Sequence, residues 1–314
     1  MKIRLLDKNT SIQFQVALQE FEAQFHYPLG ENKSFSISHG EDYSAFYRSM
    51  GVPYCLIAEE QNKVIGTFCC ALRQIHMRDT NQDKTIVYLG DLKVSKQKQR
   101  TTVYYRLAEV MFKMIHEKTD TAIAMVMDGT RKTPDQYTGK LGLPQFHKLN
   151  RHVILRINTD TNDIDFPVTS VDCDVGSGIY RSMCNENYLQ FSTENIRSNI
   201  NPIWIVSRDK NACGKLEDTE KVKRLFSDDG SELRSAHLSH FVFANIHAAY
   251  ELLAAALHTS KLNGFPCLFL CLTEQEYNQL LPVINSFKYD MATATLYSNQ
   301  DYLNSGLHFN TAEI

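Results

Sequence analysis

The segment with the most chemical content runs from residue 88 to residue 107. It predicts a strand that ends near Val94, then a short basic loop, then the first turn of a helix. Such a turn has backbone N–H groups without helical partners and the positive end of the helix dipole, and both favour a phosphate group. Lys96, Lys98 and Arg100 add positive charge to the loop. The segment therefore predicts an anion site, with a merely solvated basic loop as the alternative.

Two pairs of histidines raise the question of metal binding. His237 and His240 are three residues apart in an expected strand, which places them on opposite faces. His147 and His152 form the second pair, and no cysteine or carboxylate completes either set. We therefore expect no metal site.

A charged run lies in the second half of the chain. It contains Glu217, Asp218 and Glu220, followed by Lys221, Lys223 and Arg224. Ion pairs between exposed side chains contribute little stability. The run is interpreted as a charged, solvated turn.

The composition describes a folded protein of near-neutral charge. The chain has 314 residues, 43% of them hydrophobic, and a formal net charge of −3. This length suggests two domains, and the charge argues against nucleic acid or an anionic membrane as a partner. No apolar stretch approaches the ~20 residues of a membrane span, and the 8 cysteines are scattered without a Cys-x-x-Cys pair. We expect a cytoplasmic protein in a reducing compartment.

The elements that would position the anion site alternate in type through the first half. Predicted strands cover 2–6, 85–94, 121–127 and 152–157, a β-hairpin covers 54–73, and predicted helices cover 11–25, 42–50, 103–118 and 134–141. A polar, turn-forming segment at 158–165 predicts a domain boundary, which divides the chain into 1–160 and 161–314.

The second half repeats the end of that order. Segments 203–206 and 221–226 surround a polar turn region, and then come a strand at 237–244, a helix at 248–262, a strand at 266–272, a helix at 274–287 and a strand at 292–297. Strand, long helix, strand, helix and strand thus occur twice. This order suggests a tandem duplication of one mixed α/β unit.

The first half is similar to the GNAT superfamily of acyl-CoA N-acyltransferases. Residues 91–94, Asp-Leu-Lys-Val, resemble the end of the family's fourth strand, after which Gln/Arg-x-x-Gly-x-Gly/Ala opens a helix. Gln99 falls in the first place of this signature, whereas Thr102 and Tyr104 stand at the two small positions. A glycine there lets the backbone approach a pyrophosphate without a Cβ. The resemblance therefore implies a phosphate loop that is weaker or differently shaped.

The resemblance covers roughly residues 1–157. The hairpin, with Val-Ile-Gly-Thr-Phe at 64–68, is similar to the family's second and third strands, and 121–127 is similar to its fifth, which splays from the fourth to open a slot for the pantetheine arm. This implies acetyl-CoA or another acyl-CoA as co-substrate. The residues implied for binding it are Leu92, Lys93, Val94, Gln99, Arg100, Thr101, Thr102, Val103, Tyr104 and Arg131.

In such enzymes an amine attacks the thioester directly. A base or a water relay removes a proton, a backbone amide of the fourth strand polarises the carbonyl, and an acid protonates the leaving thiolate. The candidate base is Asp91, the carboxylate nearest to the slot. The alternative is a strand-end aspartate that caps the loop or pairs with Lys93 or Arg100.

The candidate acid is Tyr137. The family takes this acid from a tyrosine four residues before the glycine that follows its last helix. Here that glycine is Gly142, the residue four before it is Thr138, and the tyrosine stands one place earlier. One residue turns a helical side chain by about 100°, so an exposed helix tyrosine is the alternative.

The second unit is expected to lack a CoA site. Its loop between strand and helix could contain only Asn245, Ile246 and His247, without a Lys or Arg. Three such residues are too few to surround a pyrophosphate. Trp204, the single tryptophan, is expected in the core of this unit.

Three functions fit these features. The first is a tandem GNAT-fold N-acetyltransferase that moves an acetyl or other short acyl group from acyl-CoA to a small-molecule amine or a peptide in the cleft between the halves. The second is a binding or regulatory module that has lost catalysis. The third is an acyltransferase supplied by an acyl carrier protein, which would dock on basic residues such as Lys93, Lys96, Lys98 and Arg100.

Overall fold

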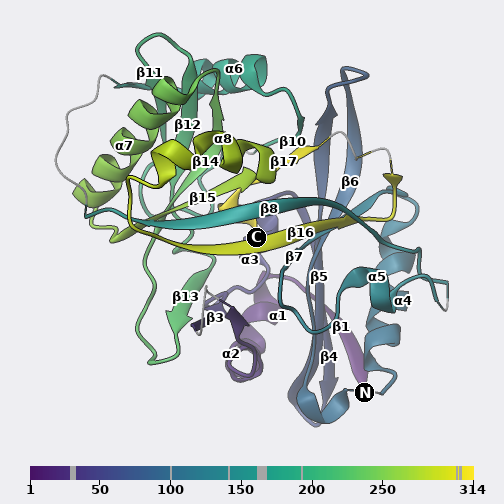
Figure 1. The fold of residues 1–314 in the computed structure, drawn as a ribbon. Helices are drawn as coiled ribbons and strands as arrows, with labels where there is room; N and C mark the ends of the chain where they lie inside the picture. The colour runs from purple at the N-terminus through teal and green to yellow at the C-terminus, as the bar shows by residue number, and fades with distance from the viewer. Residues whose placement is uncertain are drawn as a thin grey trace.

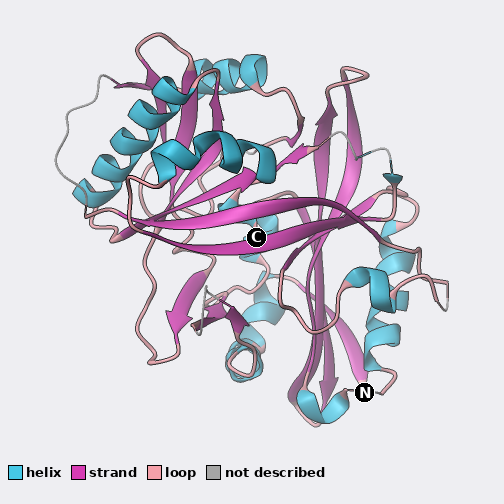
Figure 2. Ribbon diagram, viewed as in Figure 1, coloured by secondary structure: helices cyan, strands magenta, loops and turns pink. Residues whose placement is uncertain are grey.

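The computed structural model describes residues 1–28, 33–99, 101–140, 142–160, 168–191, 194–301, 303 and 306–314. These residues form a mixed α/β fold in which helices pack on both faces of one large sheet (Figures 1 and 2). None of the helices described is long and apolar enough to cross a membrane. The predicted fold class is confirmed.

The large sheet contains strands from both halves of the chain. Its order is β1-β4-β5-β6-β7-β16-β8-β15-β14-β12-β11-β9. The first half supplies β1 (Lys2–Leu6), β4 (Val52–Glu60), β5 (Lys63–Met77), β6 (Gln82–Val94), β7 (Ala122–Met127) and β8 (His147–Asn158). The second supplies β9 (Val168–Val171), β11 (Ile203–Ser207), β12 (Ala212–Glu217), β14 (Ala236–Phe243), β15 (Cys267–Thr273) and β16 (Tyr289–Ser298). Beside this path, β10 (Asn187–Leu189) pairs with β5 and with β17 (Leu307–His308).

The two halves exchange strands. β16 of the second half lies between β7 and β8 of the first, and β8 in turn lies between β16 and β15. Figure 1 shows β8 and β16 crossing the middle of the molecule together. The sheet is therefore continuous across both halves. The boundary predicted near residue 160 lies between β8 and β9, where 161–167 are outside the described residues, and it stays a prediction.

A small second sheet also joins distant parts of the chain. It consists of β2 (Tyr27–Pro28), β3 (Ser34–Ser38) and β13 (Arg224–Ser227), in the order β13-β3-β2. The sequence prediction contains no counterpart of β2 and β3. The segment 221–226 was expected beside 203–206, but β13 lies in this small sheet instead.

Most helices lie where the sequence predicts them. They are α1 (Lys8–Gln13), α2 (Gln15–Glu22), α3 (Ala45–Arg48), α4 (Val103–Ile115), α5 (Pro134–Tyr137), α6 (Cys173–Met183), α7 (Ile246–Leu262) and α8 (Glu274–Ile284), with the 3-10 turns η1 (Lys96–Lys98) and η3 (Thr311–Glu313). The helix predicted at 11–25 is divided at Phe14, which ends α1 and precedes α2. No prediction was made for α6.

The helix predicted at 134–141 ends earlier, at Tyr137. Thr138 has an extended backbone, and its hydroxyl donates to the carbonyl of Pro134 at 2.6 Å. This bond satisfies a helical carbonyl and stops the helix. Leu141 lies outside the described residues.

Helix α4 covers one face of the first half's sheet because its apolar side chains recur on one side. Val103, Leu107, Met111 and Ile115 are all buried. Gly66 of β5 permits the close approach of the helix, since a Cβ there would lie 3.0 Å from Cγ1 of Val103 and 3.1 Å from Cδ1 of Leu107. The helix and its loop are thereby fixed against the sheet.

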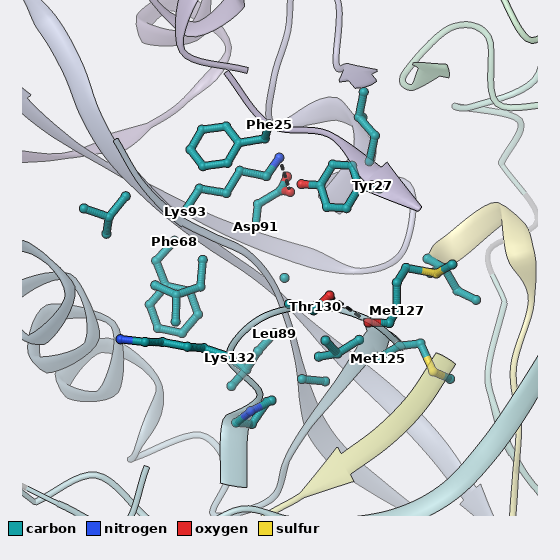
Figure 3. A pocket seen from close by; sticks show the side chains of 18 of the residues that line it. Phe25, Tyr27, Phe68, Leu89, Asp91, Lys93, Met125, Met127, Thr130 and Lys132 are labelled. Carbon is teal, nitrogen blue, oxygen red and sulfur yellow. Dashed lines mark hydrogen bonds and ion pairs between the residues drawn. The ribbon is translucent and has the colours of Figure 1, made fainter. Parts of the chain in front are cut away.

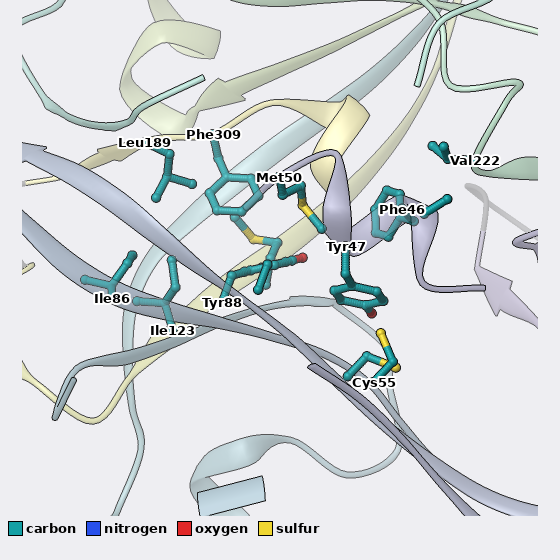
Figure 4. Packing of buried hydrophobic residues seen from close by; sticks show 14 of the residues in the cluster. Phe46, Tyr47, Met50, Cys55, Ile86, Tyr88, Ile123, Leu189, Val222 and Phe309 are labelled. Atoms are coloured by element: carbon teal, nitrogen blue, oxygen red, sulfur yellow. The ribbon is translucent and has the colours of Figure 1, made fainter. Parts of the chain in front are cut away.

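The opposite face of this sheet packs against α2 and α3. Phe46 and Tyr47 of α3 lie in one buried cluster with Tyr88 of β6 and Phe309 (Figure 4). In the second half Trp204 is 2% exposed and belongs to an aromatic cluster, so its predicted core position is confirmed.

The interpretation of 217–224 as a solvated turn is wrong. Glu217 ends β12, and its carboxylate lies 3.1 Å from Nε of Arg197 and 3.0 Å from Nζ of Lys215. Asp218 is buried as well. A charge can be buried when its partners are also buried, and sequence proximity does not reveal such partners.

These residues belong to a buried ion network that joins the two halves. Arg197 also lies 3.5 Å from Glu313, and Glu313 pairs with Arg73 of β5 at 2.8 Å. The side chains of Arg73, Glu313, Arg197, Glu217 and Lys215 are at most 9% exposed. The network fixes the C-terminal turn η3 against the first half of the sheet.

Candidate active site

A cavity of about 1080 Å³ passes through the large sheet between β6 and β7. These parallel strands pair only over 87–88 of β6 and 122–123 of β7. Beyond these pairs, residues 89–94 and 124–127 line the cavity. The strands therefore diverge and leave a slot, as the resemblance implies.

The slot joins two compartments on opposite faces of the sheet. Leu89, Leu92 and Val94 pack with the core under α4, whereas Tyr88 and Met125 pack with the core of the other face. We call the compartment beside α4 the loop side, and the compartment on the opposite face the chamber. Figure 3 shows the slot from close by.

Two loops line the loop side, one before α4 and one after β7. The lining residues are Lys98, Gln99 and Thr101 from the first, Arg131 and Lys132 from the second, and Tyr104 from the first turn of α4. Lys98 forms an ion pair with Glu60. The N-cap of α4 is Thr102, whose side chain makes no capping hydrogen bond with the first turn. Basic side chains and a helix N-terminus thus meet here, and together they can attract an anion.

The residues predicted to bind a co-substrate fall into three groups. Those that line the cavity are Leu92, Lys93, Val94, Gln99, Thr101, Tyr104 and Arg131. Val103 instead packs in the core beside Gly66, and Thr102 ends the loop. Arg100 lies outside the described residues. Binding of a co-substrate by these residues stays a prediction.

Two tyrosines narrow the loop side. The ring centroids of Tyr104 and Tyr137 lie 5.4 Å apart with the planes nearly perpendicular, and the Tyr104 hydroxyl donates to the carbonyl of Tyr137 at 3.3 Å. Tyr104 therefore occupies space that a small residue would leave open and supports the short helix α5.

Tyr137 itself lines the cavity and is half-buried. Burial, with smaller contributions from Tyr297 and Asp135, raises the pKa of its phenol well above the ordinary value. The phenol therefore stays protonated, as a proton donor must. Thr138, which takes the family's tyrosine position, lines the cavity but uses its hydroxyl in bonds to the chain. The role of Tyr137 as acid stays a prediction.

A β-bulge in β6 sets the direction of Asp91. The ladder with β5 pairs Thr67 with Lys93 and then Cys69 with Gly90, so two residues of β6 lie opposite one of β5. Asp91, one of the two, has a left-handed backbone with φ of 46°, and its carbonyl accepts the Thr67 hydroxyl at 2.7 Å. The bulge directs the side chains of Asp91 and Lys93 into the chamber.

The carboxylate of Asp91 is surrounded by donors. Lys93 Nζ lies 2.7 Å from Oδ1, the Tyr43 hydroxyl donates to Oδ2 at 3.0 Å, and His39 Nε2 is 3.5 Å from Oδ2. Burial alone would raise the pKa of Asp91, but Lys93, His39 and Tyr43 hold it well below its usual range. The alternative of a pair with Lys93 is thus what the structure shows, while the role of Asp91 as base stays a prediction.

His39 continues the polar cluster away from the chamber. Its Nδ1 lies 2.5 Å from Oε1 of Glu22 in α2, while its Nε2 faces Asp91. Both ring nitrogens are thus directed at carboxylates. The imidazole can position Asp91, but neither nitrogen is free to accept a proton from a substrate.

Lys93 is enclosed by aromatic rings. Its Nζ lies 5.8 Å from the ring centroid of Phe25 and 5.6 Å from that of Tyr27, and Figure 3 shows both rings beside the Lys93–Asp91 pair. Burial lowers the pKa of Lys93, but Asp91 more than compensates and raises it overall. The pair is therefore fixed in its ionised form.

The second half forms the far wall of the chamber. Residues from it that line the cavity are Lys223, Leu225, His237, Phe269, Ala292, Thr311 and Ile314. Nζ of Lys223 donates to the backbone oxygen of Ile314 and lies 4.7 Å from the ring centroid of Phe46. Burial, with Arg197 nearby, lowers the pKa of Lys223 to about 7 although Asp91 opposes this shift.

His237 faces the same chamber. Its Nδ1 lies 2.8 Å from the hydroxyl oxygen of Thr311, and its ring stacks on Phe269 at 5.3 Å. Burial and the neighbouring Lys223 lower the pKa of His237 to about 3, so the imidazole is neutral near pH 7. His240 instead stacks on Trp204. The described residues contain no group of three or more His, Cys, Asp or Glu side chains arranged to hold a metal.

Sequence reasoning missed most of the chamber. Tyr27 comes from the short strand β2, His39 and its neighbour Tyr43 come from the segment between β3 and α3, and Lys223 and His237 come from the other half. The one signal for Lys223 was its place in the charged run, where a solvated position was expected. The chamber depends on contacts between segments about 200 residues apart, which local patterns do not record.

Comparison with known proteins gives structural matches only. No family model matches the sequence, and no curated protein matches it. Saccharomyces cerevisiae N-myristoyltransferase with bound myristoyl-CoA matches with a TM-score of 0.62 and 9% identity over 95% of this chain and 82% of that chain.

A candidate acetyltransferase from Pyrococcus horikoshii matches with a TM-score of 0.61 and 12% identity over 98% of this chain and 92% of that chain. A conserved Enterococcus faecalis protein of unknown function, named as a probable N-acyltransferase, matches with a TM-score of 0.54 and 9% identity over 95% and 71%. In each case the likeness extends over both halves of this chain.

Proposed function

The chain has the GNAT-like acyl-CoA N-acyltransferase fold, and on that premise we propose that it transfers an acetyl or other short acyl group from acyl-CoA to the amine of a small-molecule or peptide acceptor. The observation that supports this most is the slot between β6 and β7. It connects an electropositive loop at a helix N-terminus with a buried chamber on the other face of the sheet. Two ligands can thus enter, one from the loop side and one from the chamber, and they can meet at the bulge of β6.

Each compartment has a part in this proposal. Lys98 in the loop before α4, together with Arg131 and Lys132 in the loop after β7, holds the phosphates of acyl-CoA. Its pantetheine arm runs through the slot and brings the thioester to the bulge, where a backbone amide of β6 polarises the carbonyl. The acceptor occupies the chamber. In the reaction the amine nitrogen forms a bond to the carbonyl carbon, the C–S bond breaks, and the CoA thiolate leaves.

Two side chains handle the protons. Tyr137 donates its phenolic proton to the thiolate, which its raised pKa permits because the phenol is protonated at the outset. Asp91 receives the proton of the attacking amine. Since Lys93, His39 and Tyr43 keep its pKa low, Asp91 is a weak base and releases the proton to solvent, and the Tyr137 phenolate takes a proton from solvent in turn. The rate should therefore follow the deprotonation of the acceptor amine itself.

Isothermal titration with acetyl-CoA and with free CoA tests this function. We expect micromolar binding by the unaltered protein. Lys132→Glu reverses a charge that lines the loop side and should weaken binding about tenfold or more. Lys140→Glu makes the same change at an exposed position that does not line the cavity and should have no effect.

Two outcomes contradict the proposal in different ways. Absence of binding at millimolar CoA would exclude the proposed enzyme and would favour the alternative function as a binding or regulatory module. Equal losses of CoA affinity in Lys132→Glu and Lys140→Glu would show that the net charge of the protein, rather than the loop side, attracts the ligand.

A further inference from the structure

The walls of the chamber are mostly apolar. Its aromatic lining consists of Phe25, Tyr27, Phe35, Phe46, Tyr47, Tyr88 and Phe269, and Ile37, Leu225, Met125, Met127 and Ile154 complete it. These side chains can desolvate a compact ring or aliphatic body, but they offer few hydrogen bonds to a polar one.

The charges of the chamber are mostly positive. Among the described residues that line the cavity, Asp91 is the one with an acidic side chain, and Lys93 already pairs with it at 2.7 Å. Lys223 adds a second amine on the opposite wall. An acceptor with one ammonium group can approach Asp91, but a second ammonium group would meet two lysines and, among the described lining residues, no second acidic side chain.

Three of the aromatic rings that could attract a second cation already lie beside a lysine. Lys93 lies over Phe25 and Tyr27, and Lys223 lies over Phe46 at 4.7 Å. A cation on an aromatic face is stabilised by the ring quadrupole, and a second ammonium group would have to compete with these lysines for it.

The protonation of Lys223 gives independent support. Burial lowers its pKa to about 7, although its Nζ donates to the backbone oxygen of Ile314 and Phe46 lies beside it. Asp91 and Glu313 favour the charged form, whereas Arg197 opposes it. Burial at this wall thus disfavours an ammonium group, whether it belongs to Lys223 or to the acceptor.

From these walls and charges we infer that the acceptor is a monoamine with a compact apolar body, and that Lys223 excludes amines with a second positive charge. This inference rests on the proposed function and adds the class of acceptor to it.

The test compares two amines that differ by one aminomethyl group, which carries the second charge. Phenethylamine and 4-(aminomethyl)phenethylamine share one body, and spermidine serves as a flexible polyamine. With saturating acetyl-CoA, release of free thiol gives kcat/KM for each amine. We expect phenethylamine to be preferred about tenfold or more over the diamine, because like charges in a desolvated site repel strongly.

Variants connect this preference to the chamber. Lys223→Met retains the apolar stem without the charge and should reduce the preference at least severalfold while acetyl-CoA binding stays unchanged. Leu225→Asp adds a carboxylate to the same wall and should reverse the preference. Lys221→Met changes an exposed lysine two residues away and should leave it as it was.

Failure of the inferred acceptor class and failure of the proposed function would give different results. A diamine or spermidine used as well as phenethylamine, or a preference unchanged in both chamber variants, would overturn the assigned class. So would acetyl-CoA binding without turnover of phenethylamine. Absence of acetyl-CoA binding in the unaltered protein would instead contradict the proposed function.

Discussion

Asp91 and His240 occupy the same place in the two halves of the sheet. Asp91 lies in the bulge of β6 against β5, and His240 lies in the bulge of β14 against β12. Both have a left-handed backbone, with φ of 46° and 54°. A shared irregularity of this kind is stronger support for a tandem duplication than the order of elements, because bulges belong to particular positions in a fold.

The surroundings of the two bulges differ. His240 is packed among aromatic rings, with ring centroids 5.7 Å from Trp204, 4.9 Å from Tyr180 and 4.5 Å from Phe191. The space that corresponds to the chamber is therefore filled by side chains in the second half.

The helix termini differ as well. The Asn245 side chain accepts the backbone N–H of Ala248 at 2.9 Å and so caps α7, whereas Thr102 offers α4 no side-chain cap. An anion at α7 would have to compete with this cap. We propose that the second unit has no CoA site and serves as the far wall of the chamber.

Closing the slot should abolish cofactor binding without unfolding the protein. Ala124 of β7 lines the cavity where β6 and β7 diverge. In Ala124→Phe the ring would occupy the slot, so titration calorimetry should detect no binding of acetyl-CoA. Ala292→Phe places the same ring in the chamber and should leave CoA binding intact while raising KM for the acceptor. Normal affinity in Ala124→Phe would mean that the ligand does not pass between the strands.

The ion pair of Asp91 and Lys93 should matter for stability as well as for turnover. Asp91→Asn leaves the buried Lys93 without a counter-charge, so the free energy of unfolding should fall by about 3 kcal/mol. Urea denaturation measures this loss. The double variant Asp91→Asn with Lys93→Met should regain most of the stability but not the activity. A stable, active Asp91→Asn protein would refute both roles.

Tyr137→Phe should lower kcat and leave the binding of acyl-CoA unchanged. The change removes the proton donor to the thiolate, for which a loss of about 100-fold is typical. Steady-state kinetics with varied acetyl-CoA separates kcat from KM. Tyr105→Phe alters a second tyrosine that lines the cavity and should change neither constant. A normal kcat in Tyr137→Phe would exclude Tyr137 as the acid and leave it a structural role in contact with Tyr104.

Acid should weaken the buried ion network. Burial alone would raise the pKa of Glu313, but Arg73 and Arg197 outweigh it and lower the pKa from 4.5 to about 2. Because the folded value is the lower one, the stabilisation is complete above pH 4.5 and is lost as the pH falls toward 2. The shift corresponds to a loss on the order of 3 kcal/mol.

Urea unfolding at a series of pH values measures this effect. Glu313→Gln should be less stable than the unaltered protein at neutral pH and should lose less on acidification. Glu109→Gln, at an exposed position on α4, should show the same pH dependence as the unaltered protein. Parallel curves for all three proteins would mean that the network contributes no net stability.

The parts of the fold that the sequence predicts are those with local patterns. The hairpin, the strand that ends at Val94 and the long helix that follows show their periodicity within a few turns or strands. The slot between β6 and β7 was implied by the family resemblance that these elements carry. Asp91 was predicted at the slot because it lies near the end of β6, whereas Tyr137 was predicted from the family's tyrosine position before Gly142; both line the cavity.

The parts that could not be predicted depend on distant partners. Glu217 appears solvated in the sequence because its counter-charge Arg197 lies on another segment, 20 residues away, and the burial of Lys215, on the same strand, cannot be seen from the local pattern. Lys223 likewise appears exposed until the small sheet brings it over Phe46. Burial of charge is decided by such pairings and not by the local run of residue types.

The exchange of β8 and β16 has a consequence for the order of synthesis. β16 begins only at Tyr289, yet it is the strand that pairs with β7 and lies between β7 and β8. While a ribosome is still making the second half, the slot already translated lacks one supporting strand. The two units therefore mature together, and we expect the site to be complete only after β16 has been made.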